Sequence, residues 1–104
     1  MSIEPPDVAD AFLGGSYVTI RLGGEIDLAS RDAVSAALLA CPTDTLELRV
    51  DLAQVTFIDV TGVAVLLAAA NNLERRGGSL TLEQPHPRIR RILSLLGAAH
   101  LVAD

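Results

Sequence analysis

Residues 55–63 read VTFIDVTGV, and this stretch decides the fold. Its apolar, β-branched first half is typical of a buried strand that ends at an acid. Beyond Gly62, a run of Val, Leu and Ala residues without proline predicts a mostly buried helix. Thr61 stands where that helix should begin, so we predict that its oxygen caps an unpaired backbone N–H. The position is also predicted to be exposed, and a phosphate there would meet the positive end of the helix dipole.

The segments on either side alternate between strand and helix patterns. Leu48, Val50 and Leu52 alternate with charged residues, which is the clearest strand pattern in the chain. Ser30 is predicted to cap a helix whose apolar stripe ends at Cys41. The predicted elements are an edge strand near Phe12, strands at 17–22, 46–52 and 79–83, and helices at 31–41, 61–76 and 87–96, the last two ended by Gly77 and Gly97. Such an order predicts parallel strands joined by right-handed crossovers, with helices covering the sheet.

Composition and charge exclude several classes of function. The chain has 104 residues, 50% of them apolar, which fits one domain with an aliphatic core. Its net charge of −5 argues against nucleic acid or an anionic membrane as the partner. Its single cysteine, Cys41, cannot form an internal disulfide and is read as a core residue. Neither a leader nor a membrane-spanning stretch is recognised, so we expect a cytoplasmic domain without membrane insertion.

Two motifs carry a resemblance to a known family. Residues 57–62, FIDVTG, resemble the Asp-Ser-Ser/Thr-Gly signature of STAS domains, which include the bacterial anti-sigma factor antagonists. Residues 22–27, LGGEID, are similar to the Gly-Glu-Leu-Asp segment of the same family. The two motifs stand in the family's order, and the resemblance covers roughly residues 17–97.

The resemblance implies an α/β fold: a mixed, mostly parallel β-sheet of about four to five strands, covered by about three or four α-helices. Residues 1–104 are expected to form a single STAS domain, with residues 1–10 as a loose N-terminal arm. Family members usually have one more helix after Gly97, and we expect it to be missing or shortened here.

The resemblance also implies that Thr61 is a phosphorylation site, because its hydroxyl directly precedes Gly62 as in the family motif. Read from position alone, the same threonine is a structural N-cap with no further role. The family often has a second hydroxyl one position earlier, where this chain has Val60. Thr61 is therefore the one acceptor that the motif offers.

A partner-binding surface is implied around this acceptor. Its expected members are Asp27, Asp59, Val60, Thr61, Gly62 and Val63, the two valines adding apolar area. Asp59 has an equally weighted interpretation as a solvated acid that stabilises the helix N-terminus. Asp27 and, less so, Glu25 are expected to help dock the partner, the alternative being that they are solvated turn acids. Gly62 is expected to be required for close approach, either by a partner or by neighbouring elements at the helix start.

Other arrangements of reactive residues do not form a recognisable site. His86 and His100 have no metal-ligand spacing with acids or with the cysteine, so no metal and no cofactor is expected. The Gly-Gly pairs, including 23–24, are read as breaks rather than as a phosphate-binding loop. A basic cluster, Arg88, Arg90 and Arg91 with His86, is read as a solvated helix face, the alternative being a contact with an acidic partner.

The function implied is that of an anti-sigma factor antagonist that is not an enzyme. It would bind an anti-sigma factor with serine/threonine kinase activity, free a sigma factor for transcription, and be switched off by phosphorylation at Thr61. One alternative is a small STAS subunit of a membrane transport (ABC-type) complex that docks on its ATPase. Another is an enzyme or nucleotide-binding domain, which the sequence supports little because it offers no coordinated set of acid, base and nucleophile.

Overall fold

The computed structural model describes residues 10–14, 17–40 and 47–103, and they form a four-stranded sheet with the order β1-β2-β3-β4. The strands are β1 (Asp10–Gly14), β2 (Tyr17–Ile26), β3 (Glu47–Ile58) and β4 (Ser79–Glu83). β1 pairs with β2 in an antiparallel sense, and β2, β3 and β4 are parallel. The predicted mixed, mostly parallel sheet is therefore confirmed, together with the edge strand near Phe12.

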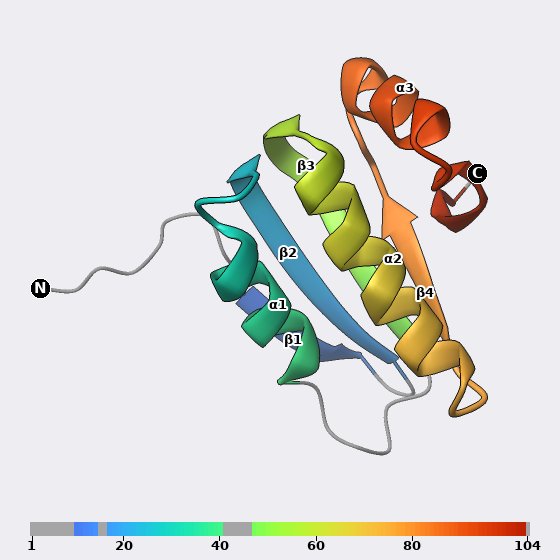
Figure 1. Ribbon diagram of the computed structural model, residues 1–104. Coiled ribbons are helices and arrows are strands. Elements are labelled where there is room, and N and C mark those ends of the chain that lie inside the picture. The colour runs from blue at the N-terminus through green and yellow to red at the C-terminus, as the bar shows by residue number, and fades with distance from the viewer. Residues whose placement is uncertain (1–9, 15–16, 41–46, 104) are drawn as a thin grey trace, which may run out of the picture.

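Three α-helices follow the parallel strands: α1 (Arg31–Leu39), α2 (Val60–Glu74) and α3 (Pro87–Leu95). Figure 1 shows α1 and α2 side by side across one face of the sheet. α3 lies at the end of the sheet where the parallel strands finish. The further helix that family members usually have after Gly97 was expected to be missing or shortened here. The described residues after Gly97 contain a 3-10 turn, η1 (Ala99–Leu101).

The core is aliphatic and is centred on β3. Leu48, Val50 and Leu52 are buried, as the alternating pattern predicted. The strand then continues to Ile58, whereas the sequence suggested two separate pieces. β3 carries an extra residue at two places: Arg21 to Gly23 of β2 faces Asp51 to Gln54, and Gly24 to Glu25 faces Val55 to Phe57. Each such bulge shifts the alternation of buried and exposed residues by one position. A search for strict alternation in the sequence therefore does not recognise the strand as continuous.

β2 is also longer than predicted. It was expected to end at Leu22, but it runs through Gly23 and Gly24 to Ile26. The two glycines are therefore not a break. A Cβ on Gly23 would lie 3.2 Å from the Cβ of Gln54, and Gly24 has a positive φ of 72°. Glycine is thus suited to the place where the two strands change register.

The helix ends agree with the predicted glycine stops. Gly77 and Gly97 have φ values of 84° and 86°, the left-handed conformation that ends a helix. The N–H of Gly78 also donates to the carbonyl of Leu73 at 2.9 Å, which closes the end of α2. α1 ends at Leu39, and the predicted contribution of Cys41 lies outside the described residues. The same is true of the predicted arm, except that Asp10 already belongs to β1.

Candidate functional site

The two acidic segments singled out in the sequence lie together at one end of the sheet. Ile26 at the end of β2 pairs with Ile58 at the end of β3, so Asp27 and Asp59 leave neighbouring strands at the same edge. The N–H of Asp59 donates to the carbonyl of Ile26 at 3.3 Å, which ties the two connections to each other. The connection that contains Asp27 therefore lies close to the connection that contains Asp59.

The start of α2 differs from the prediction, because Asp59 and not Thr61 is the N-cap. Asp59 has extended backbone angles, φ −123° and ψ −169°, and its Oδ1 accepts a hydrogen bond from the N–H of Gly62 at 3.1 Å. Thr61 is already the second residue of the helix. An aspartate is a better cap than a threonine, and its negative charge suits the positive end of the helix dipole.

This assignment makes a prediction that separates the two residues. Asp59→Ala should lower the free energy of unfolding by about 1 kcal/mol, because the N–H of Gly62 loses its acceptor. Thr61→Ala should change it by no more than about 0.5 kcal/mol. Urea unfolding followed by far-UV circular dichroism measures both changes. Asp59→Asn is the matched control, since asparagine caps nearly as well without the charge. A larger loss for Thr61→Ala than for Asp59→Ala would contradict the assignment.

Thr61 lies on the first turn of α2 and is half-buried. Within the described part of the chain, its hydroxyl has no hydrogen-bond partner. Val60 precedes it and is 64% exposed. The Thr61 hydroxyl therefore takes no part in capping α2.

Gly62 and Val63 lie beneath the surface. A Cβ on Gly62 would lie 2.5 Å from the carbonyl oxygen of Ile26 and 2.8 Å from Cγ1 of Ile58. Glycine is thus needed for packing at the helix start, the second of the two roles expected for it. Val63 is 2% exposed and belongs to the core, so the prediction that it adds apolar area to a partner surface is wrong. It lies on the face of α2 that packs against the core.

The connection after β2 is held by a reciprocal pair of hydrogen bonds. The N–H of Asp27 donates to Ser30 Oγ at 3.0 Å, and the N–H of Ser30 donates to Asp27 Oδ1 at 3.2 Å. The Ser30 hydroxyl also donates to the carbonyl of Glu25 at 2.7 Å. Ser30 stands at the N-cap position of α1, as predicted, but its side chain makes no capping bond and holds the loop instead. Asp27 is therefore a structural residue of this loop as well as a candidate contact.

One candidate surface residue was missed in the sequence. Leu28, in the loop between Asp27 and Ser30, is 65% exposed. Leu28 and the exposed Val60 follow two strand ends that pair with each other, Ile26 and Ile58, and grouped exposed apolar residues mark interaction sites. The sequence shows an apolar residue between an acid and a helix start at this position, but the structure is needed to show that it is exposed. We use "acceptor surface" for Asp27, Leu28, Asp59, Val60 and Thr61.

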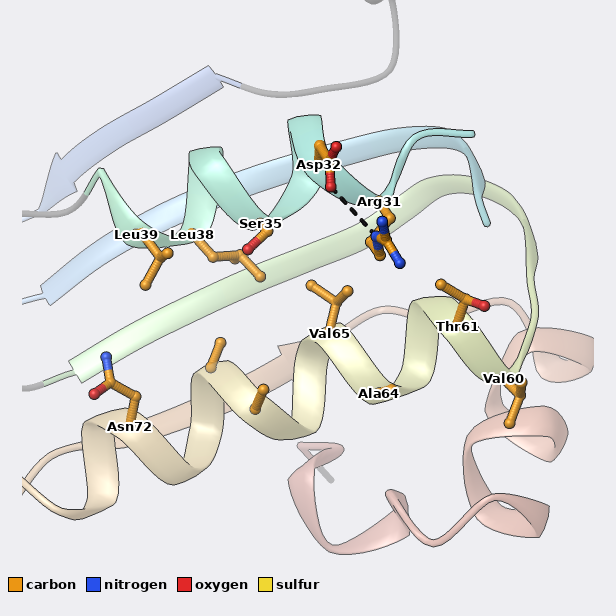
Figure 2. Close-up of a pocket in the computed structure, with 12 residues that line it drawn as sticks. Arg31, Asp32, Ser35, Leu38, Leu39, Val60, Thr61, Ala64, Val65 and Asn72 are labelled. Carbon is orange, nitrogen blue, oxygen red and sulfur yellow. Dashed lines mark hydrogen bonds and ion pairs between the residues drawn. The ribbon is translucent and has the colours of Figure 1, made fainter. Parts of the chain in front are cut away.

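A groove opens beside the acceptor surface, between α1 and α2 (Figure 2). It has a volume of about 580 Å³. Its walls are mainly apolar, and Val60, Thr61 and Arg31 stand at the end where both helices begin. The lining residues are Arg31, Asp32, Ser35, Leu38, Leu39, Val60, Thr61, Ala64, Val65, Ala68, Ala69 and Asn72. Arg31 was not singled out in the sequence, because its proximity to Thr61 depends on how α1 packs against α2.

The structure also locates the other features considered in the sequence. Among residues 10–14, 17–40 and 47–103, no group of three His, Cys, Asp or Glu side chains is placed to hold a metal ion. In the same ranges, no helix has both the length and the apolar character needed to cross a membrane. Arg88, Arg90 and Arg91 are exposed on α3, which His86 precedes at its N-cap position.

Comparisons with known proteins agree with this geometry. A family model described as "Mlab, STAS domain" matches residues 13–103. An anti-sigma-B factor antagonist of Bacillus subtilis (strain 168) is 27% identical over 85 residues, which cover 82% of this chain and 78% of that protein.

Solved structures show the same fold. A crystal structure of an anti-sigma factor antagonist from Mycobacterium paratuberculosis has a TM-score of 0.77 and 26% identity, covering 91% of this chain and 83% of the other. The anti-sigma factor antagonist SpoIIAA in its unphosphorylated form has a TM-score of 0.74 and 24% identity, covering 93% and 87%, which shows a shared fold. With the motifs at 22–27 and 57–62 brought together at one edge of this fold, the chain belongs to the STAS domain family.

Proposed function

We propose that this protein is an anti-sigma factor antagonist of the cytoplasm, and that phosphorylation of Thr61 switches it off. In its unphosphorylated form it binds an anti-sigma factor with serine/threonine kinase activity, so that a sigma factor is released. The observation that carries the proposal is the Thr61 hydroxyl: Thr61 is half-buried, lines the groove beside exposed Val60, and does not cap α2. The names of the relatives in Bacillus subtilis and Mycobacterium paratuberculosis support the antagonist role.

The acceptor surface supplies the contacts that such a complex needs. Val60 and Leu28 are 64% and 65% exposed and provide apolar anchors. Asp27 and Asp59 provide negative charge beside them. Binding free energy in protein interfaces is concentrated in a few such central residues, with polar groups around them setting orientation. Asp27 and Asp59 are fixed by their hydrogen bonds to Ser30 and Gly62, so they present their carboxylates in one arrangement.

Phosphate transfer would take place inside the complex. The partner, carrying ATP and magnesium, transfers the γ-phosphoryl group to Thr61 Oγ1. A new O–P bond forms at the threonine as the bond to ADP breaks, and the hydroxyl proton passes to a base of the kinase or to water. The added group brings about −1.5 to −2 charges next to Asp59. Like-charge repulsion and the loss of hydration at the interface then favour dissociation.

The first experiment identifies the partner. The tagged wild-type chain, Thr61→Ala and Thr61→Glu are used as baits in native cell extract, and the retained proteins are identified by mass spectrometry. We expect wild type and Thr61→Ala to retain an anti-sigma factor of the kinase type, and Thr61→Glu to lose it. A transporter ATPase retained equally by all three baits would overturn the proposal and favour the transport-complex alternative. Nucleotide released from the purified chain, with no partner retained, would favour the nucleotide-binding alternative.

A further inference from the structure

Arg31 faces the acceptor threonine across the groove between α1 and α2. It is the first residue of α1, and it lines the groove together with Thr61. Figure 2 shows its side chain reaching from α1 toward the first turns of α2. Although these residues are about thirty positions apart in the sequence, the packing of α1 against α2 places Arg31 and Thr61 at the same end of the groove.

The positions of the two helix starts are fixed by hydrogen bonds. Ser30, directly before Arg31, is bound to Asp27 through both backbone and side chain, at 3.0 and 3.2 Å. Thr61 follows the cap formed by Asp59, whose N–H is bound to the carbonyl of Ile26 at 3.3 Å. The connection from β2 to α1 and the connection from β3 to α2 are therefore linked by a hydrogen bond where they leave the sheet. This link restricts how far the first turns of α1 and α2 can move apart.

The present partner of Arg31 holds it weakly. Its Nε lies 3.3 Å from Oδ1 of Asp32, and the two side chains are 49% and 92% exposed. Exposed ion pairs of this kind contribute little to stability, because water and salt screen them. A guanidinium in such a pair can turn to a stronger anion at little cost. A phosphate is that anion, since it carries up to two charges and matches the fork of an arginine.

We propose that a phosphate on Thr61 is bound within the domain by Arg31, which bridges α2 to α1 across the open end of the groove. This inference rests on the proposed phosphorylation of Thr61. The phosphate would otherwise face the carboxylates of Asp32 in the groove and Asp59 at the helix cap, with Asp27 in the neighbouring loop. Arg31 is the cation lining this groove, so it supplies the balancing charge. The phosphorylated form is then a defined state with the groove end closed.

The ionisation of the phosphate itself tests the proposal. Phosphothreonine is introduced at position 61 by genetic encoding, so that no kinase is needed, and the full chain is titrated by phosphorus-31 NMR around the ordinary second pKa of about 6. An opposing charge favours the dianion. We therefore expect the pKa in the wild-type background to be lower by about one unit than in Arg31→Ala. Arg31→Lys keeps the charge and should retain most of the difference.

A matched control separates this contact from a general effect of charge. Arg75→Ala also removes one exposed arginine, but Arg75 is at the C-cap of α2, at the opposite end of the helix from Thr61. The phosphate pKa in that variant should equal the wild-type value. Equal pKa values in the wild type and in Arg31→Ala would overturn the proposal. That result is independent of partner binding: a phosphorylated chain that still binds its partner contradicts the proposed switch, whatever the pKa shows.

Discussion

Replacing Gly62 by alanine is expected to lower the free energy of unfolding by about 1–3 kcal/mol. The added methyl group would meet the carbonyl oxygen of Ile26 at 2.5 Å and the side chain of Ile58 at 2.8 Å. Neither atom can move easily, because the backbone of Ile26 pairs with β3 and Ile58 is 1% exposed. α2 would have to shift away from the sheet, and the acceptor surface would move with it.

The direction of the change in stability distinguishes a steric clash at Gly62 from the effect of helix propensity. Helix propensity alone favours alanine over glycine by about 1 kcal/mol, so a helix free of neighbours would be stabilised by the change. Urea unfolding of the two proteins decides between the two effects. Gly77→Ala serves as a comparison, because an added Cβ there has open space and only the φ of 84° opposes it. A higher stability for Gly62→Ala than for the wild type would contradict the packing described at the helix start.

Phosphorylation at Thr61 is expected to weaken binding of the kinase-type partner by about a thousandfold, which corresponds to about 4 kcal/mol. The phosphate adds a strongly hydrated dianion at the centre of the acceptor surface, within the same helix start as Asp59. Thr61→Glu should lose less, because a carboxylate carries one charge and is smaller. Isothermal titration calorimetry with the partner found by affinity capture measures the dissociation constants.

Thr61→Ala is the control for this series. It removes the acceptor without adding charge, so it should bind with nearly wild-type affinity and resist inactivation by the partner and ATP. Raising the salt concentration should reduce the difference between the phosphorylated and unphosphorylated chains if charge repulsion is its cause. A dissociation constant that is unchanged by the phosphate would contradict the proposed switch.

Much of the fold could be predicted because local patterns agree with it. The alternation at Leu48, Val50 and Leu52 marks the central strand, and its residues are buried as expected. Gly77 and Gly97 stop two helices through their left-handed backbone, which few other residues adopt. These features depend on neighbours in sequence, and a sequence shows them directly.

The errors arose where tertiary pairing decides between local options. Asp59 and Thr61 are both residue types that cap helices well. In the structure Asp59 is the cap, and its N–H also donates to the carbonyl of Ile26 on another strand. With Asp59 as the cap, α2 begins at Val60, and Val63 on its first turns is buried in the core. The bulges in β3 likewise become visible only in the register with β2.

The residues of the candidate site also fall into two groups: those that short motifs indicate and those that only tertiary packing brings together. Asp27, Asp59, Val60 and Thr61 could be named in advance because short motifs carry them. Leu28 was missed, although it lies within one of those loops, because an exposed apolar residue is recognised only once its exposure is known. Arg31 could not be found at all by motif, since it becomes a neighbour of Thr61 only when two helices pack together.

The connection between β3 and α2 consists of Asp59 alone, and this brevity has a consequence for the speed of regulation. A one-residue linker that is hydrogen-bonded on both sides leaves the acceptor surface little freedom before a partner arrives. Association then resembles the docking of preformed shapes, with little ordering entropy to lose. If the proposed phosphate acts as a switch, it would change the lifetime of the complex mainly through the dissociation rate. Under the proposed function, the rates of phosphorylation and dephosphorylation, rather than a rearrangement of this domain, would then set the speed of the switch.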